Sequence, residues 1–225
     1  MKLSTIYSDG MILQRDRECA IRGIFDPNET IEVFLDGKSL AVQTDVDKGI
    51  FSAFVPATTA GGPHEITIHV NGIKRQTIGD ILFGDVFILG GQSNMELPLI
   101  WTTDYYYDEI RSADFTEIRQ FEVPKVPLFG EKSLILEGGS WVNAQQEGIN
   151  NFSAIGFYFA KYKYLKDQIP VGLVQTAVGG APVESLMSEE NLRESFSRIE
   201  KDLIHSGKCN GDKSKGCLWC YKDKL

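Results

Sequence analysis

A serine that follows a glycine pair at the end of an apolar run is the residue of this sequence best placed to do chemistry. The run Asp85–Leu89 is rich in β-favouring apolar residues, which predicts a buried parallel strand. The run ends at Gly90-Gly91, where the backbone can turn sharply and expose the side chains that follow. Open α/β folds place ligands and chemistry at this end of their strands. Ser93 is therefore positioned as a nucleophile.

The same pattern is compatible with other chemistry. Glycine-rich strand ends also bind phosphate, so a nucleotide site competes with a nucleophile at this position. The chain contains neither G-x-x-x-x-G-K-[ST] nor G-x-G-x-x-G, which argues against that competitor. It also lacks the G-x-S-x-G turn of many α/β-hydrolases. Taken alone, Ser93 leaves a catalytic and a structural role open.

The elements that must position Ser93 alternate between strand and helix from about residue 82. Ser153 is a predicted N-cap because Ile155, Phe159 and Tyr162 follow it at helical spacing. Gly179-Gly180 follow an apolar strand. A glycine pair at this position is also typical of an ordinary strand-to-helix turn without a functional role. Such alternation predicts a parallel sheet flanked by helices. The expected elements are a helix at 103–112, a strand at 118–123, a helix at 154–166, a strand at 171–176 and a helix from Ser188 to Gly207.

The first 80 residues have a different pattern, with short alternating strands between turn residues. Asp36-Gly37 and Asn71-Gly72 are strong signals for tight hairpins. His64 and His69 fall within one such strand, and we interpret them as sheet residues rather than metal ligands. The predicted organisation is a small all-β sandwich at 1–80 followed by an α/β domain at 81–225.

Composition narrows the function classes. The chain has 225 residues, a formal charge of −8 and a pI near 5.0, which argues against nucleic-acid binding. No apolar stretch is long enough to span a bilayer, so no membrane partner is expected. The N-terminus lacks the apolar core of a signal peptide, which predicts a cytoplasmic protein, or a secreted or periplasmic one if a leader was removed. Composition does not predict the oligomeric state.

A family resemblance adds to this interpretation. Gly91–Pro98 (GQSNMELP) resembles the first conserved block of the SGNH-type carbohydrate esterases, specifically the sialate O-acetylesterase group. The resemblance implies a flavodoxin-like three-layer α/β sandwich behind the β-domain, and it covers nearly the whole chain. Further similar segments are Ser8–Arg15, Phe152–Ala154, Gly172–Thr176 and Gly179–Ser185.

The resemblance also implies a mechanism. Ser93 would attack an acetyl ester on a carbohydrate, either a sialic acid or an acetylated plant glycan, with a histidine as general base. The backbone N–H groups of Ser93 and of Gly179 or Gly180 would form the oxyanion hole. This chemistry needs no metal and no organic cofactor.

Three further residues are candidate substrate-binding groups on the same basis. Gln92 and Asn94 would orient the substrate or brace the turn, and bracing is the favoured role. Glu184 would fix the glycine loop or contact the sugar. The family usually has a tryptophan shortly after this position, where the chain has Leu186 and Met187.

The largest departure from the family concerns the general base. The family carries an Asp-x-x-His or Asp-x-His block well beyond the second glycine pair, whereas the chain offers only Asp202 and His205 on a predicted peripheral helix. Lys215–Trp219 resembles a strand of the family, but the residues that follow it, Cys220–Leu225, do not match the family's next motif. We therefore expect a shortened catalytic domain that is inactive or impaired. The alternatives are a non-catalytic carbohydrate-binding remnant and another acyl hydrolase of the SGNH fold.

A rival interpretation of the last residues is metal binding. The spacing H-x3-C-x7-C-x2-C supplies four ligands that suit tetrahedral zinc. Against it, Cys217 and Trp219 fit the alternation of a buried strand. The four residues concerned are His205, Cys209, Cys217 and Cys220.

Overall fold

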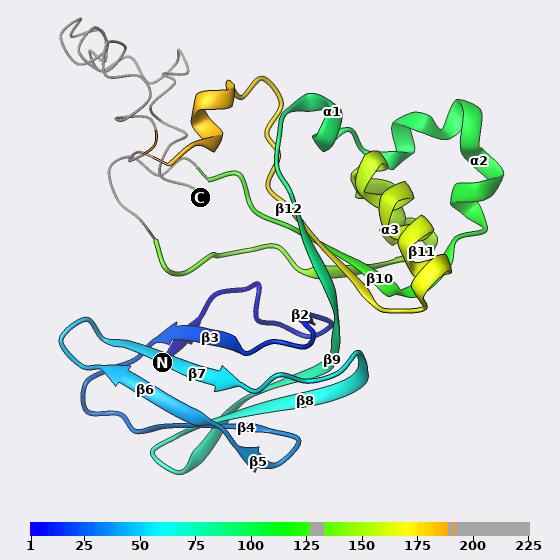
Figure 1. Ribbon diagram of the computed structural model, residues 1–225. Coiled ribbons are helices and arrows are strands. Elements are labelled where there is room, and N and C mark those ends of the chain that lie inside the picture. The colour runs from blue at the N-terminus through cyan, green and yellow to red at the C-terminus, as the bar shows by residue number, and fades with distance from the viewer. Residues whose placement is uncertain (127–132, 189–190, 192–225) are drawn as a thin grey trace, which may run out of the picture.

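One long strand, β9 (Ile73–Leu89), runs through both halves of the molecule (Figure 1). The computed structural model describes residues 1–126, 133–188 and 191. The first part of β9 pairs with β8 (Gly61–Val70) in antiparallel register, and the last part, Asp85–Leu89, pairs in parallel with β12 (Val171–Gln175). The strand therefore belongs to the β-sandwich at one end and to the α/β layer at the other.

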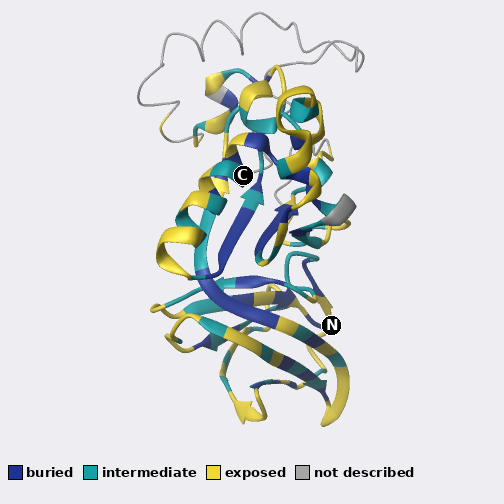
Figure 2. Ribbon diagram, turned by 90° about the vertical axis from the view of Figure 1, so that its right-hand side faces the viewer, coloured by how far each residue is buried: buried dark blue, intermediate teal, exposed yellow. Residues whose placement is uncertain are grey.

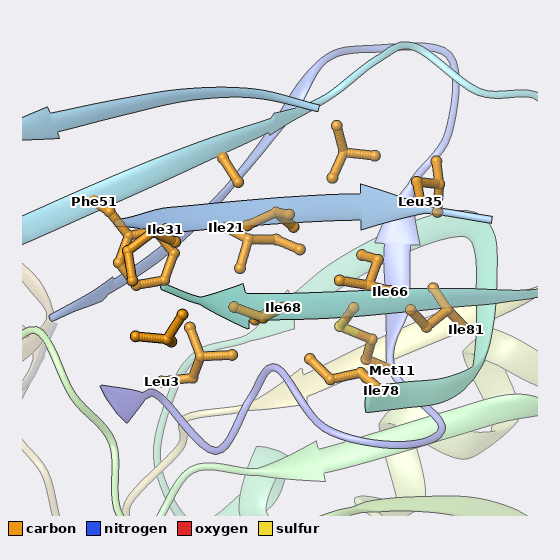
Figure 3. Packing of buried hydrophobic residues seen from close by; sticks show 14 of the residues in the cluster. Leu3, Met11, Ile21, Ile31, Leu35, Phe51, Ile66, Ile68, Ile78 and Ile81 are labelled. Atoms are coloured by element: carbon orange, nitrogen blue, oxygen red, sulfur yellow. The ribbon is translucent and has the colours of Figure 1, made fainter. Parts of the chain in front are cut away.

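The sandwich consists of two sheets around one core. The first sheet has the strand order β1-β3-β7-β6, and the second contains β9, β8, β4 and β5, with β2 paired beside β9. Ile21, Phe51 and Ile68 are fully buried between the sheets, and Figure 3 shows their side chains meeting. The remaining strands are β1 (Lys2–Leu3), β2 (Ile12–Gln14), β3 (Cys19–Ile24), β4 (Ile31–Leu35), β5 (Lys38–Ser39), β6 (Ala41–Asp45) and β7 (Ile50–Val55).

Both predicted hairpin turns form. Asp36-Gly37 joins β4 to β5 with φ angles of 49° and 76°, and Asn71-Gly72 joins β8 to β9 with 53° and 73°. Positive φ at both central residues is the geometry of a tight hairpin, and Asn, Asp and Gly adopt it at the lowest cost. His64 and His69 lie in β8, so their assignment as sheet residues is confirmed.

The α/β layer extends the second sheet with the order β9-β12-β10-β11. β10 (Asp114–Glu122) is parallel to β12, and β11 (Trp141–Gln145) is antiparallel to β10. Predicted strands at 118–123 and 171–176 are confirmed, with each end within four residues of its predicted position. Leu89, Gln175 and Glu122 lie side by side at the carboxyl ends of the three parallel strands.

Helices cover one face of this layer. α3 (Ala154–Asp167) packs on it with Phe157 and Ala160 fully buried, and the hydroxyl of Ser153 caps the helix by accepting the Gly156 N–H at 3.1 Å. α3 confirms the predicted helix at 154–166, and a helix over Thr103–Arg111 confirms the one predicted at 103–112. The other helical segments are α1 (Ser93–Glu96), η1 (Leu99–Thr102), α2 (Thr103–Arg111), η2 (Gln146–Asn151) and η3 (Val183–Leu186).

The prediction that Asp85–Leu89 is a parallel strand is confirmed, but the strand is only partly buried. Phe87 packs edge-on against Phe159 of α3, with ring centroids 4.8 Å apart, but Ile88 is 73% exposed. Successive side chains of a strand point to opposite faces, so α3 covers the face that carries Phe87 and leaves Ile88 uncovered among the described residues. Figure 2 shows the middle of β9 as a buried segment that connects the two halves.

The predicted domain boundary does not coincide with the end of a strand. The boundary at residue 80 falls inside β9. The strand continues through Asp80, although this residue adopts a φ of 52°. The division into domains 1–80 and 81–225 stays a prediction. The predicted helix from Ser188 to Gly207 lies almost wholly outside the described residues.

Candidate active site

The turn that carries Ser93 forms at the carboxyl end of β9. Gly91 has a φ of 145°, a conformation that glycine adopts freely, and α1 begins two residues later. The carbonyl of Gln92 accepts the N–H groups of Met95 and Glu96 at 2.9 and 3.0 Å. Ser93 is the first residue of this short helix and its side chain is exposed. The hydroxyl group is therefore accessible at the edge of the sheet where ligands bind in α/β folds.

The second glycine pair lies directly beside this turn. The Thr176 N–H donates to the carbonyl of Leu89 at 3.0 Å, and the Val178 N–H donates to the carbonyl of Gly91 at 3.1 Å. A Cβ atom placed on Gly179 would lie 3.8 Å from the Cβ of Ser93. The structure thus brings Ser93 and the loop at Gly179-Gly180 together, although Ser93 and Gly179 are 86 positions apart in the sequence.

Glu96 is a functional candidate that the sequence analysis missed. One carboxylate oxygen accepts the N–H of Gly179 and the other pairs with Lys125. The hydrogen bond from Lys125 lowers the pKa of Glu96 below its ordinary value, against the opposing effect of burial and with help from the Gly179 N–H. The same pair raises the pKa of Lys125. A carboxylate three residues after the nucleophile, on the next turn of a helix, was the available signal.

Because of this contact, the backbone N–H of Gly179 is hydrogen-bonded within the described part of the chain, whereas those of Ser93 and Gly180 are not. The Gly179 N–H is engaged by Glu96, and a Cβ atom on Gly179 would approach that carboxylate to 2.7 Å. Among the described residues, the amides of Ser93 and Gly180 have no acceptor. Gly180 has a φ of 77° and is exposed, so its N–H is available to a ligand.

Of the predicted substrate-binding residues, the structure describes the side chains of Gln92 and Asn94 and only the backbone of Glu184. The side chains of Gln92 and Asn94 are exposed on either side of Ser93, and the hydrogen bonds that hold this turn come from main-chain groups. The backbone of Glu184 lies in η3, after the glycine loop, and its side chain is outside the described part of the chain.

The histidines are not near Ser93 in the part of the chain that is described. His64 pairs with Asp36 at 2.6 Å, and His69 packs against Phe34, both within the sandwich. Asp202 and His205 lie outside the described residues, as do the other proposed zinc ligands, Cys209, Cys217 and Cys220. Between residues 1 and 126 and between 133 and 188, no group of three or more His, Cys, Asp or Glu side chains is arranged to hold a metal.

Known proteins resemble the chain in sequence and structure. Residues 83–221 match the family described as "Carbohydrate esterase, sialic acid-specific acetylesterase". Sialate O-acetylesterase of Homo sapiens is 23% identical over 209 residues, which cover 85% of the chain and 40% of that protein. The Mus musculus protein of the same name is 29% identical over 217 residues, covering 85% of the chain and 38% of that protein.

A solved structure extends the comparison to the fold. The crystal structure of XAC1771, "a novel carbohydrate acetylesterase from Xanthomonas citri", superposes with a TM-score of 0.78 and 34% identity. The match covers 85% of the chain and 43% of that structure, which confirms the predicted SGNH-like fold class. The chain thus spans about two fifths of the length of the relatives it matches. In the described part, no helix combines the length and apolar character needed to cross a bilayer.

Proposed function

The chain belongs to the sialic acid-specific acetylesterase family of carbohydrate esterases, and from this membership we propose that its site is built to hydrolyse O-acetyl esters on sugars. One observation carries the proposal. An exposed serine at the carboxyl end of a parallel strand lies directly against a glycine loop that offers a free backbone amide. This is the arrangement that acyl transfer through a serine nucleophile requires.

The proposed reaction proceeds through an acetyl-enzyme. The Ser93 hydroxyl oxygen attacks the acetyl carbonyl carbon, and the base takes the hydroxyl proton as the tetrahedral intermediate forms. Collapse of the intermediate breaks the bond to the sugar oxygen, which leaves with that proton. Water then attacks the acetyl-serine by the same route and releases acetate.

The oxyanion would be stabilised by the two unengaged amides, those of Ser93 and Gly180. Gly179 then has a different part, because its N–H is held by Glu96 and so fixes the loop at its distance from Ser93. Removal of a single oxyanion donor typically costs about 3–4 kcal/mol of transition-state stabilisation. Gln92, Asn94 and Glu184 remain proposals as substrate-binding residues.

We further propose that the 225-residue chain is impaired as a catalyst. Its sequence contains three histidines, and the two that are described lie in β8 of the sandwich, where neither serves Ser93. The remaining candidate base is His205 with Asp202. A serine hydroxyl without a base is a weak nucleophile at neutral pH.

Ser93-dependent hydrolysis of 4-nitrophenyl acetate tests both proposals. We expect the unmodified chain to exceed the Ser93→Ala variant only slightly. Imidazole can act as a general base from solution, so its addition should raise the rate of the chain well above that of Ser93→Ala at the same imidazole concentration.

The outcomes separate the alternatives. An imidazole effect that is equal in both proteins would overturn the esterase site and favour a non-catalytic carbohydrate-binding protein. Strong turnover without imidazole would overturn the impairment. In that case, loss of activity in His205→Ala would identify His205 as the base, and retention would show that another group serves.

A further inference from the structure

A hollow of about 420 Å³ lies on the outer face of the sandwich, over strands β3, β7 and β6. These strands lie side by side in Figure 1. The volume falls within the range of roughly 300–1,000 Å³ that is typical of small-molecule sites. None of the residues that line the hollow belongs to the proposed active site, so the hollow is a separate candidate for ligand binding.

The strand register places three polar side chains of the hollow in one row. Ser52 of β7 pairs with Arg22 of β3 on one side and with Gln43 of β6 on the other. Phe51, the neighbour of Ser52, is fully buried in the core, so Ser52 and the two residues paired with it point outward. Neighbouring strands are about 4.8 Å apart, so the row extends over roughly 10 Å. It presents a guanidinium group, a hydroxyl group and an amide group to the hollow.

The described part of the protein does not engage the polar groups of this row. Among the described residues, the arginines with ion pairs are Arg15 and Arg119, so the guanidinium group of Arg22 has no carboxylate partner there. The side chains of Gln43 and Ser52 likewise form no hydrogen bond with a described residue. All three side chains are therefore available to a ligand.

The charges of the hollow favour an anion at Arg22. The lining includes one further cation, Lys48, and one carboxylate, Asp45, and these two pair with each other at 3.0 Å. The Asp45 carboxylate also accepts the backbone N–H of Lys48 at 3.1 Å. The charges of the lining residues thus sum to +1, with Arg22 as the cation that is not paired. A guanidinium group can hold a carboxylate by two parallel hydrogen bonds, which suits it to this ligand better than an ammonium group.

Two apolar side chains complete the hollow. Ile50 of β7 is partly exposed on the same face, and Leu134 contributes from the segment after β10. This segment is held against the sandwich, because the N–H of Leu136 donates to the Ser4 hydroxyl and its carbonyl accepts the Thr5 N–H, both at 3.0 Å. Apolar surface beside groups that bind hydroxyls and amides suits the ring and substituents of a sugar.

We propose that this hollow is a second carbohydrate site, in which Arg22 binds the carboxylate of an acidic sugar such as a sialate while Gln43 and Ser52 bind its hydroxyl or amide groups. The site holds the sugar without changing it chemically, and it does not depend on the esterase activity. On a glycan with several acidic sugars, binding of one sugar here raises the local concentration of the others around the protein.

Titration of the full ¹⁵N-labelled chain by NMR tests the proposal. The probe is the methyl α-glycoside of N-acetylneuraminic acid. Its carboxamide lacks the negative charge, and acetate carries a carboxylate without a sugar. We expect the sialoside to shift the amide signals of Gln43 and Ser52 at low salt and to bind more weakly as salt screens the exposed charge. The carboxamide and acetate should each bind there at least fivefold more weakly than the sialoside.

Arginine variants provide the matched comparison. Arg22→Gln removes the guanidinium group and should weaken sialoside binding at least fivefold. Arg22→Lys keeps the charge but loses the paired hydrogen bonds, so its affinity should lie between those of the unmodified chain and Arg22→Gln. Arg75→Gln, an equivalent change at an exposed position of β9 in the sandwich, should leave the affinity as it was.

Several results would overturn the proposal. One is that the sialoside shifts neither Gln43 nor Ser52, and another is that Arg22→Gln binds it as tightly as the unmodified chain does. Carboxamide binding as tight as that of the sialoside would show that the carboxylate is not recognised, and acetate binding as tight would show a general anion site. Ser93→Ala should give the same shifts as the unmodified chain, because Ser93 lies outside the hollow. Loss of the shifts in that variant would place the sugar at the proposed active site instead.

Discussion

Glu96 links the chemistry of individual residues to the geometry of the site. Its carboxylate holds the Gly179 N–H on one side and Lys125 on the other, so a single side chain fixes the glycine loop relative to Ser93. Ionised carboxylates form stronger hydrogen bonds than neutral ones, so this positioning depends on Glu96 remaining charged. We regard Glu96 as a positioning residue, because its contacts are with the loop rather than with the reacting atoms.

The Glu96 contact predicts a pH-dependent signal from Gly179. The folded-state pKa of Glu96 lies below its ordinary 4.5, so its stabilising contribution is present above that pH and is lost as the pH falls through the folded value. The contribution is about 1 kcal/mol or less, because the pair is partly exposed. In an NMR pH titration, the Gly179 amide proton should move with a midpoint below 4.5.

Two lysine variants check the cause of this shift. Lys125→Met removes the hydrogen bond that lowers the pKa most, so the midpoint should rise. Lys48→Met removes a lysine paired with Asp45 in the sandwich and should leave the Gly179 titration unchanged. A Gly179 signal that does not respond to acid in the unmodified chain would contradict the role given to Glu96.

At the scale of elements, the position of Ser93 depends on how closely β9 and α3 can approach their neighbours. Gly84 lies in the part of β9 where antiparallel pairing gives way to parallel pairing, and a Cβ atom there would overlap the carbonyl group of Pro170. α3 is anchored by the Ser153 cap immediately after the segment that lies against η1. In the first feature a backbone carbonyl limits the approach, and in the second a side-chain hydroxyl holds a backbone N–H.

Gly84→Ala should destabilise the chain by about 1–3 kcal/mol, because the added methyl group meets backbone that cannot move away easily. Gly79→Ala is the matched control, since a Cβ at this position in the same strand meets no atom closer than 3.9 Å. It should change the free energy of unfolding by less than about 0.5 kcal/mol. Urea unfolding measures the free energy of unfolding of both variants. Equal losses would show that the close contact with Pro170 is not what makes Gly84→Ala destabilising.

Ser153→Ala should cost about 1 kcal/mol, because it leaves the Gly156 N–H without its buried acceptor. Ser112→Ala alters a serine at the exposed end of α2, whose hydroxyl donates to the carbonyl of Glu109 at 3.3 Å, and should stay within about 0.5 kcal/mol. The midpoints of urea unfolding compare the two variants. A neutral effect of Ser153→Ala would mean that water replaces the cap.

At the scale of the whole molecule, buried polar contacts hold the sandwich and the α/β layer together. Arg119 of β10 is 6% exposed and donates to the carbonyls of Gly10 and Asp80 at 2.9 and 2.6 Å. Asp85, at the start of the parallel pairing, accepts from Arg15 of the sandwich and pairs with Lys163 of α3. Burial raises the pKa of Asp85, but the hydrogen bonds from Lys163 and Arg15 outweigh it and lower the pKa.

Arg119→Met should destabilise the chain by about 3 kcal/mol or more, since it removes charged hydrogen bonds and leaves the partly buried carbonyl groups of Gly10 and Asp80 without their donor. Asp80→Asn keeps the carbonyl contact and loses only an ion pair whose carboxylate is 62% exposed, so its cost should be below about 1 kcal/mol. Thermal unfolding followed by circular dichroism distinguishes them. Similar losses in both variants would place the stabilisation in the ion pair instead.

The sequence by itself determined the features that depend on neighbouring residues. The hairpins at Asp36-Gly37 and Asn71-Gly72, the Ser153 cap and the exposed turn at Ser93 follow from backbone sterics and short-range hydrogen bonds. These physical causes act within a few residues, so the pattern of the chain is sufficient to predict them. The family motif in the same turn also identified the esterase family.

Only the tertiary structure decided how distant segments meet. The continuity of β9 through residue 80, the exposure of Ile88 and the contact of Glu96 with Gly179 all depend on which elements pack together. Strand order also places Lys125 beside Glu96, 29 residues away. Side-chain chemistry fixes what such groups can do, but long-range packing selects their partners, and no local pattern encodes that choice.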